Sequence, residues 1–276
     1  MVLQPCTWPA AASMRAPGVL RPQAQPATVL AAFPTALYLR LESHDEVLPV
    51  VGRRGLRLPT AVTLATDAPR IGWGVQPGDR VEVGGGTVRL PLVEVTVVRR
   101  WRPAELPFAS VSSATLPPEA LHALSAQPWL PPLNWREPAR LLTRTLLAGE
   151  SVDRQVAALV GAGPGLTPSG DDLLCGTLLA LRLHRPDGEL LVRRLWAAVA
   201  PRLPGTTSLS ASLLTEAAHG YAWDGVLRLL WALLEGPGSE MATAARAVLG
   251  LGHTSGADLL GGLLGTLDAA VGPRAG

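Results

Sequence analysis

Lysine is absent from this chain of 276 residues, and all 24 of its basic residues are arginines. The absence excludes chemistry that depends on a lysine amine, such as a Schiff base or the phosphate-binding lysine of a P-loop. Only two cysteines are present, Cys6 and Cys175, and they lie too far apart in the sequence for a zinc or redox spacing. A reduced, cytoplasmic setting is therefore expected.

Long apolar runs and a strong net charge are also lacking. No segment offers the roughly 20 uninterrupted apolar residues that a membrane span needs, and the proline-rich first thirty residues do not have the pattern of a signal peptide. The net charge is only +2 and the arginines are scattered, so we expect neither a nucleic acid nor a membrane as partner. The clusters "RRGLR" and "RRWR" are interpreted as solvated surface, with contact to an anionic substrate or a partner subunit as the alternative.

The hydrophobic pattern changes once along the chain. From about Val29 to Trp101, short segments rich in Val, Leu and Thr alternate between apolar and polar residues, and the glycines of "RVEVGGGTVRL" indicate a hairpin. Beyond the prolines that follow, apolar residues recur at helical spacing in about eight segments. We therefore predict an α+β protein with an N-terminal antiparallel β barrel or sandwich-like domain and a C-terminal all-helical domain.

The same pattern predicts the domain boundaries. Residues 1–28 are expected to be poorly ordered or peripheral, and residues 29–104 to form the β-rich domain. Residues 105–137 are predicted to be a proline-rich connection with one short helix. Residues 138–276 are predicted to be the helical domain, which carries the motifs described next.

The densest motif is "GAGPGLTPSGDDLLCG", residues 161–176. Gly161, Gly163 and Gly165 indicate a backbone that adopts positive φ repeatedly or approaches another group closely. The motif has the GxxxxG frame of a P-loop, but Asp171 and Asp172 occupy the Lys and Ser/Thr positions, which disfavours a bare phosphate loop. A glycine-rich loop with two carboxylates could still hold an anion through Mg²⁺ or place an Asp as general base.

A purely structural interpretation of this motif is a helix start. Thr167 and Ser169 can each cap a helix that begins near residues 168–171, and Ser169 and Asp172 have the spacing of a capping box. Their carboxylate neighbour Asp171 would face the positive end of the helix dipole. Because a plain cap needs neither three glycines nor a second carboxylate, a functional site is the favoured interpretation.

The end of the chain repeats this motif. "SGDDLLCGTL" at residues 169–178 and "SGADLLGGLL" at residues 255–264 share seven of ten residues, and a glycine-rich segment precedes each. Two helix starts of one design in one helical domain are expected to converge on a common centre. The expected pairs are Ser169 with Ser255 and Asp172 with Asp258.

A third helix start lies between the two repeats. In "PGTTSLSASLL", Thr206, Thr207 and Ser208 are candidate caps. Hydroxyls and backbone N–H groups at several helix starts make a polar cradle for a carboxylate or a phosphate. Gly176 and Gly262 would let the helices that follow the two repeats pack closely.

Together, "GPGLTPSGDDLL", "TTSLS" and "GHTSGADLLGG", after a strand-rich first half, resemble the AllH-like family, formerly a bacterial domain of unknown function. The resemblance runs from about Ala27 to the C-terminus. It implies a subunit of oxamate carbamoyltransferase, which works with two other subunits in anaerobic allantoin breakdown, a route of purine catabolism. There, oxalurate and phosphate give oxamate and carbamoyl phosphate. The resemblance supplies no assigned catalytic residues.

The residues and the resemblance lead to one set of predictions. Asp171 and Asp172 are the catalytic candidates, and Asp172 is also the candidate ligand of Mg²⁺, the one candidate cofactor. The expected partners are a small anionic substrate, such as carbamoyl phosphate or oxalurate, and other protein subunits. The ligand-binding candidates are Gly163, Gly165, Thr167, Ser169, Gly170, Thr206, Thr207, His253, Thr254, Ser255 and Asp258.

Three functions stay open at this stage. The first is a subunit of a carbamoyl-transferring enzyme, and the second is a stand-alone enzyme or binding protein for another small carboxylate or phosphate compound. The third is a non-catalytic scaffold subunit whose glycines serve only close helix packing.

Overall fold

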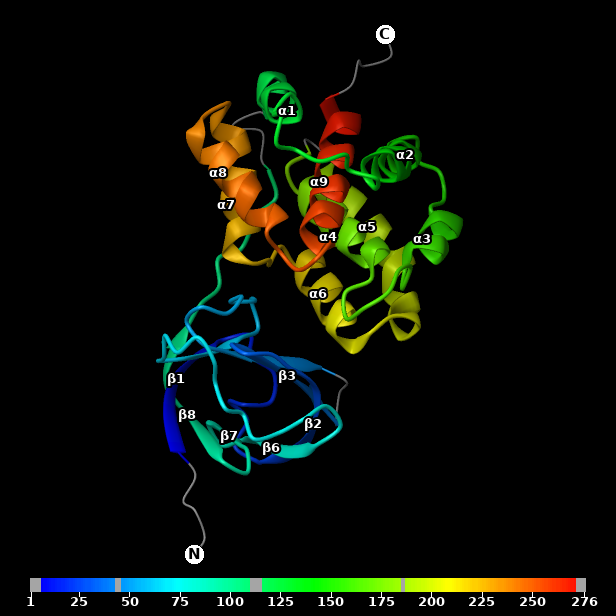
Figure 1. Cartoon of the computed structure of the whole chain (residues 1–276). Helices are drawn as coiled ribbons and strands as arrows, with labels where there is room; N and C mark the ends of the chain where they lie inside the picture. Colours follow the sequence, from blue (N-terminus) through cyan, green and yellow to red (C-terminus); the bar gives the residue numbers. More distant parts are fainter. Residues whose placement is uncertain (1–5, 43–45, 110–115, 185–186, 272–276) are drawn as a thin grey trace, which may run out of the picture. The chain divides into compact units, whose positions relative to one another are not determined.

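The computed structural model describes residues 6–42, 46–109, 116–184 and 187–271. It divides the chain into two compact units, Met1–Ala104 and Glu105–Gly276. The first unit is a β-barrel and the second is built from helices (Figure 1). Each unit has its own buried hydrophobic core.

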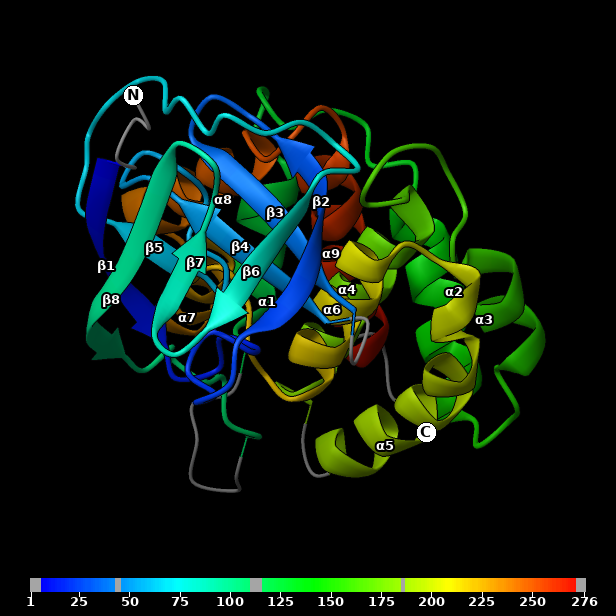
Figure 2. The ribbon, with the colours of Figure 1, turned by 90° about the horizontal axis from the view of Figure 1, so that it is seen from below.

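The first unit is a closed barrel of eight strands in its described residues, in the order β1-β5-β4-β3-β2-β6-β7-β8 (Figure 2). Apolar side chains alternate along the strands, as in β3, where Leu37, Leu39 and Leu41 are fully buried and the residues between them are partly exposed. The strands are β1 (Cys6–Ser13), β2 (Gln25–Ala32), β3 (Ala36–Leu41), β4 (Val47–Val51), β5 (Val62–Leu64), β6 (Arg80–Gly84), β7 (Thr87–Arg89) and β8 (Val93–Trp101).

The strand directions correct the predicted fold class. The prediction of an antiparallel barrel or sandwich is wrong, because β1 runs parallel to β8 and β4 runs parallel to β5. The barrel is therefore closed and mixed. Turn signals reveal only neighbours along the chain, whereas a parallel pair needs a long connection that leaves no local signal.

The first strand lies in the segment that was expected to be poorly ordered or peripheral, of which residues 6–28 are described. Residues 6–13 form β1, which pairs with both β5 and β8, and residues 25–28 belong to β2. Pro9 lies within β1, although proline has no N–H to donate to a neighbouring strand. Its carbonyl nevertheless accepts a hydrogen bond from the Ala65 N–H, at 2.9 Å. The closure of the barrel depends on this strand.

The second unit contains nine α-helices and one short 3₁₀ helix in its described residues. Helix α4 is its centre, since every residue from Gly170 to Leu181 is buried, and α9 and α6 both pack against it. No helix in the described part of the chain is long and apolar enough to cross a membrane. The helices are α1 (Pro118–Ser125), α2 (Arg136–Leu147), α3 (Asp153–Leu159), α4 (Ser169–Leu181), α5 (Gly188–Val199), η1 (Ala200–Gly205), α6 (Ser208–Ala218), α7 (Asp224–Glu235), α8 (Ser239–Leu249) and α9 (Ser255–Val271).

Candidate functional site

The glycine-rich segment before α4 is an irregular loop. Gly161, Gly163 and Gly165 have φ angles of 73°, 116° and 94°, which confirms the expected positive φ at all three. Gly161 also meets another loop, since a Cβ there would lie 2.5 Å from the Gly205 carbonyl oxygen. L side chains rarely adopt such backbone angles, and the approach to Gly205 leaves no room for one. We name residues 161–168 the glycine loop.

The helix start expected near residues 168–171 is present, but neither Thr167 nor Ser169 caps it, as the purely structural interpretation had it. The helix begins at Ser169 with Pro168 as its N-cap residue, and no side chain caps it. The Pro168 carbonyl accepts the first backbone N–H groups, from Asp171 at 3.0 Å and Asp172 at 3.1 Å. Proline presets its own φ and needs no donor, so it can start the helix without help. The hydroxyl and carboxylate side chains of the motif are therefore available for other contacts.

Asp171 ties the glycine loop to the start of α6. Its side chain is buried, and Oδ1 accepts the Gly161 N–H at 2.9 Å while Oδ2 accepts the Thr206 hydroxyl. Thr207 adds a second tie, because its hydroxyl donates to the Leu166 carbonyl at 2.6 Å. With both oxygens engaged inside the protein, Asp171 serves to position the loop.

Thr207 also caps α6, as the sequence predicts. Its Oγ1 accepts the backbone N–H of Ser210 at 3.1 Å. The third predicted helix start therefore lies directly against the glycine loop. This arrangement brings the starts of α4 and α6 together.

The repeat at the end of the chain meets the first motif across α4 and α9. The Thr167 and Ser255 hydroxyl oxygens are 2.8 Å apart and share a hydrogen bond. The predicted pair of Ser169 with Ser255 is thus replaced by Thr167 with Ser255. The two helices lie side by side in Figure 1.

The two helices use equivalent glycines to approach each other. A Cβ on Gly176 would lie 2.2 Å from the Leu259 carbonyl oxygen, and a Cβ on Gly262 would lie 2.2 Å from that of Leu173. Positions 176 and 262, like 173 and 259, are 86 residues apart, as are the two motifs. The contact is therefore reciprocal, and the two repeats face each other about an approximate two-fold axis.

Asp172 and Asp258 are both buried at this meeting point, with 5% and 8% of their surface exposed. Burial raises the pKa of Asp172 to about 8, hydrogen bonds with Ser255 and Thr167 oppose the rise, and the charges of Asp258 and Asp171 add to it. The Oδ2 atoms of both Asp172 and Asp258 are buried without a hydrogen-bond partner in the described part of the chain. A buried carboxylate oxygen without a hydrogen-bond partner lowers the stability of the fold. A ligand with N–H or O–H groups could donate the missing hydrogen bonds.

The raised pKa of Asp172 predicts a pH-dependent stability. The folded chain holds this proton more tightly than the unfolded chain, whose carboxyl has a pKa near 3.8. The contribution of this proton to the free energy of unfolding is therefore complete below pH 4. It is lost as the pH rises to about 8, by at most about 1.4 kcal/mol per pH unit. Asp172→Asn, which stays neutral, should flatten this part of the curve in chemical denaturation of the wild type and the variant. Parallel curves for the two proteins would contradict the assignment.

The loop also offers free backbone donors. In the described part of the chain, the N–H groups of Gly163, Gly165, Thr167 and Ser169 donate to no other residue. Gly163 and Gly165 are exposed, while Gly170 lies so close to the Leu159 carbonyl that a Cβ would clash at 2.0 Å. Unpaired N–H groups at a helix start are suited to bind an anion.

His253 and Thr254 are two predicted ligand-binding residues whose side chains make no hydrogen bond or ion pair with Asp172 or Asp258 in the described part of the chain. His253 and Thr254 are exposed, and neither side chain makes a hydrogen bond or ion pair to another described residue. Their participation stays a prediction. Among the described residues, no group of three or more His, Cys, Asp or Glu side chains could hold a metal ion. Asp172 and Asp258 alone would be the protein carboxylates for Mg²⁺.

Ser210 is a buried polar residue that the sequence motifs do not single out. It lies in the first turn of α6 and is 1% exposed, and its Oγ has no partner in the described residues. A buried serine among the leucines of a helix that packs on α4 was the available signal. A hydroxyl can donate and accept a hydrogen bond, and this one does neither with a described residue.

Fold and site together define a class of protein: a closed β-barrel unit joined to a helical unit in which two repeated glycine-loop helix starts share a buried carboxylate pair. Residues 159–267 match the family model of oxamate carbamoyltransferase subunit AllH. The match confirms the resemblance over this segment. It holds the whole candidate site but starts at Leu159, whereas the resemblance was expected from about Ala27. No solved structure matches the chain.

Proposed function

We propose that this chain is a subunit of an oxamate carbamoyltransferase-type complex and that the paired loops bind its small anionic substrate. The family match supports the first part. The second part depends mainly on one observation: two repeated helix starts bring together Asp172 and Asp258, each with a buried oxygen that has no partner among the described residues. The scaffold alternative accounts for Gly176 and Gly262, which pack the helices, but it leaves these carboxylates unexplained.

The site suits a substrate with an anionic end and an N–H end. Oxalurate has both, a carboxylate and a ureido group. The free N–H groups of the glycine loop would bind the carboxylate or the oxyanion that forms during transfer. The unpartnered oxygen of Asp258 would accept a ureido N–H group, and the protonated carboxyl of Asp172 would face the nitrogen that leaves.

The proposed reaction balances with Asp172 as the proton donor, because hydrogen phosphate loses its proton on attack and that proton restores the protonated Asp172. A phosphate oxygen forms a bond to the ureido carbon of oxalurate, and the bond from that carbon to the oxamate nitrogen breaks. The nitrogen leaves as a neutral amide only if it gains a proton. A pKa of about 8 keeps Asp172 protonated at neutral pH, so it can donate that proton. In the reverse direction the same carboxylate takes the proton back.

Mg²⁺ is the alternative way to neutralise this pair. Asp172 and Asp258 would hold it, and two carboxylates together with substrate phosphate and water are a common magnesium environment. The ion would supply charge stabilisation at the transferred group. Activity that persists in EDTA would support a protonated Asp172. Activity that EDTA abolishes and added Mg²⁺ restores would support a bound metal ion.

The proposed function is tested by reconstitution. The chain should co-purify with the other two subunits when they are co-expressed, and the complex should convert oxalurate and phosphate to carbamoyl phosphate and oxamate. The complex without this chain should be inactive. Full activity in its absence, or a chain that never joins the complex, would refute the proposal and favour a stand-alone binding protein.

A further inference from the structure

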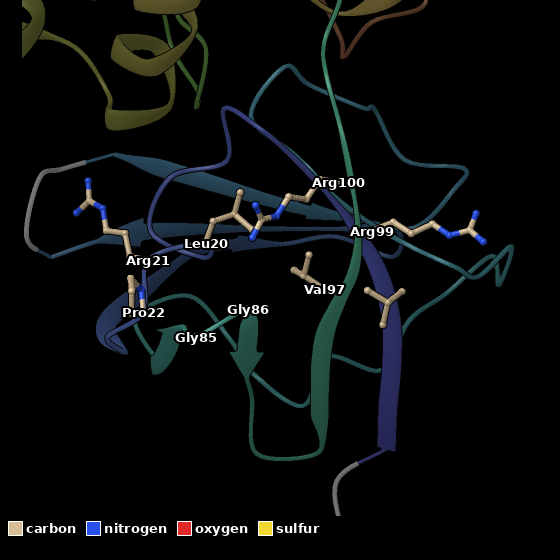
Figure 3. Close-up of a pocket in the computed structure, with 9 residues that line it drawn as sticks. Leu20, Arg21, Pro22, Gly85, Gly86, Val97, Arg99 and Arg100 are labelled. Atoms are coloured by element: carbon tan, nitrogen blue, oxygen red, sulfur yellow. The ribbon is translucent and has the colours of Figure 1, made fainter.

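The barrel carries a groove that is separate from the carboxylate site. It encloses about 610 Å³, and its walls come from the segment before β2, the β6–β7 hairpin and the end of β8 (Figure 3). Leu20, Pro22 and Val97 form an apolar floor. Gly86 keeps the groove open, since a Cβ there would meet nothing within 4 Å.

The walls of this groove are tied together by backbone hydrogen bonds. The Gly85 N–H donates to the Arg21 carbonyl at 2.7 Å, the Gly86 N–H to that of Val19 at 2.9 Å, and the Val97 N–H to that of Gly86 at 2.8 Å. Three segments that are distant in the sequence are therefore held in one arrangement. A groove of this kind is preformed and needs little ordering on binding.

A bulge in β8 turns an arginine onto the floor. Val97 pairs with Ala10 and Arg100 pairs with Ala12, so Val98 is the additional residue. Ala10 and Ala12 are buried and face inward. The bulge thus moves Arg100, which is exposed, to the side of the strand that Val97 faces, where regular alternation would have turned it to the other side. In Figure 3 the Arg100 guanidinium extends toward Leu20, whereas Arg99 extends to the opposite side.

The groove is positively charged along its length. Arg21, Arg99 and Arg100 line it, and no acidic side chain is among the described residues that do so. Arg21 pairs with Glu46 at 3.6 Å, but neither Arg99 nor Arg100 has an ion pair or side-chain hydrogen bond to a described residue. Guanidinium groups that no described residue pairs with, beside an apolar floor, favour carboxylates carried on a partly apolar chain.

We propose that this groove binds an acidic segment of a partner polypeptide, with carboxylates on Arg99 and Arg100 and an aliphatic side chain on the floor between them. The two guanidinium groups diverge, which disfavours a single small anion. No aromatic residue lines the described groove to stack a base, which disfavours single-stranded nucleic acid. The closed barrel offers no free strand edge in its described residues, so the segment would bind through side chains.

The test uses the full chain and a fluorescein-labelled peptide with the sequence EELEELE. Fluorescence anisotropy at about 50 mM salt should show saturable binding, and Arg99→Gln/Arg100→Gln should weaken it at least about fivefold. The control is Arg54→Gln/Arg70→Gln, which removes two exposed charges outside the groove. It should change the affinity less than about twofold.

Each other outcome overturns the proposal. Equal weakening by the two double variants would mean non-specific attraction, and no saturable binding would mean no peptide site. An oligothymidylate of seven nucleotides that binds more tightly than the peptide, with the same dependence on Arg99 and Arg100, would assign the groove to nucleic acid. Equal binding of the neutral peptide QQLQQLQ would show that carboxylates are not recognised.

Discussion

Replacing Asp172 by asparagine is expected to lower kcat for oxalurate phosphorolysis in the reconstituted complex by at least about a hundredfold, the usual scale of a positioned proton donor. Asparagine keeps the size and neutrality of the protonated carboxyl but cannot transfer its proton. The variant should fold, because a neutral side chain suits the buried position better than a charge does. Its thermal unfolding should occur at or above the temperature of the wild type.

The matched control for this variant is Asp153→Asn. Asp153 lies at the start of α3 and pairs with Arg202 at 3.2 Å with more than half of its side chain exposed. The loss of such a surface pair should leave kcat within about twofold of the wild type. Wild-type activity in Asp172→Asn would remove Asp172 from the mechanism.

The second large effect is expected on folding. Gly176→Ala should destabilise the helical unit by about 3 kcal/mol or more, because its methyl group would overlap the Leu259 backbone at 2.2 Å. Gly262→Ala should have a similar effect, since the contact is reciprocal. Neither backbone can move without separating α4 from α9. Chemical denaturation followed by circular dichroism at 222 nm measures the loss.

Gly205→Ala is the control for these two variants. Gly205 has no positive φ, and an added Cβ would meet nothing within 4 Å. Its change in unfolding free energy should stay within about 0.5 kcal/mol. A Gly176→Ala protein as stable as this control would show that the close packing of α4 and α9 is not needed.

Local patterns in the sequence predicted local structure. The alternate glycines of the first motif predicted the positive φ angles, and Thr207 was correctly predicted to cap α6. Both depend on neighbours a few residues away, for which residue type is informative. The repeat of "SGDDLL" by "SGADLL" also predicted a contact between distant segments, because two similar helix starts in one domain are expected to converge on a common centre.

Contacts between distant segments could not be predicted in the same way. Threonine is a common helix cap, but the Thr167 hydroxyl forms a hydrogen bond with the Ser255 hydroxyl instead. Asp171 and Asp172 are adjacent and chemically identical, yet one binds Gly161 and Thr206 while the other lies near Asp258. Only the fold separates a positioning carboxylate from a candidate proton donor. The parallel pairing of β1 with β8 was missed for the same reason.

The central claim is that the two repeats form one site, and a double-mutant cycle on kcat/KM for oxalurate tests it most directly. Asp172→Asn, Asp258→Asn and the double variant would be assayed in the reconstituted complex. The effects of substituting groups that act as a unit are strongly non-additive. The kcat/KM of the double variant should therefore be no more than about threefold below that of the less active single variant. Losses that multiply, or an Asp258→Asn enzyme with wild-type kcat/KM, would show that the repeats do not share a site.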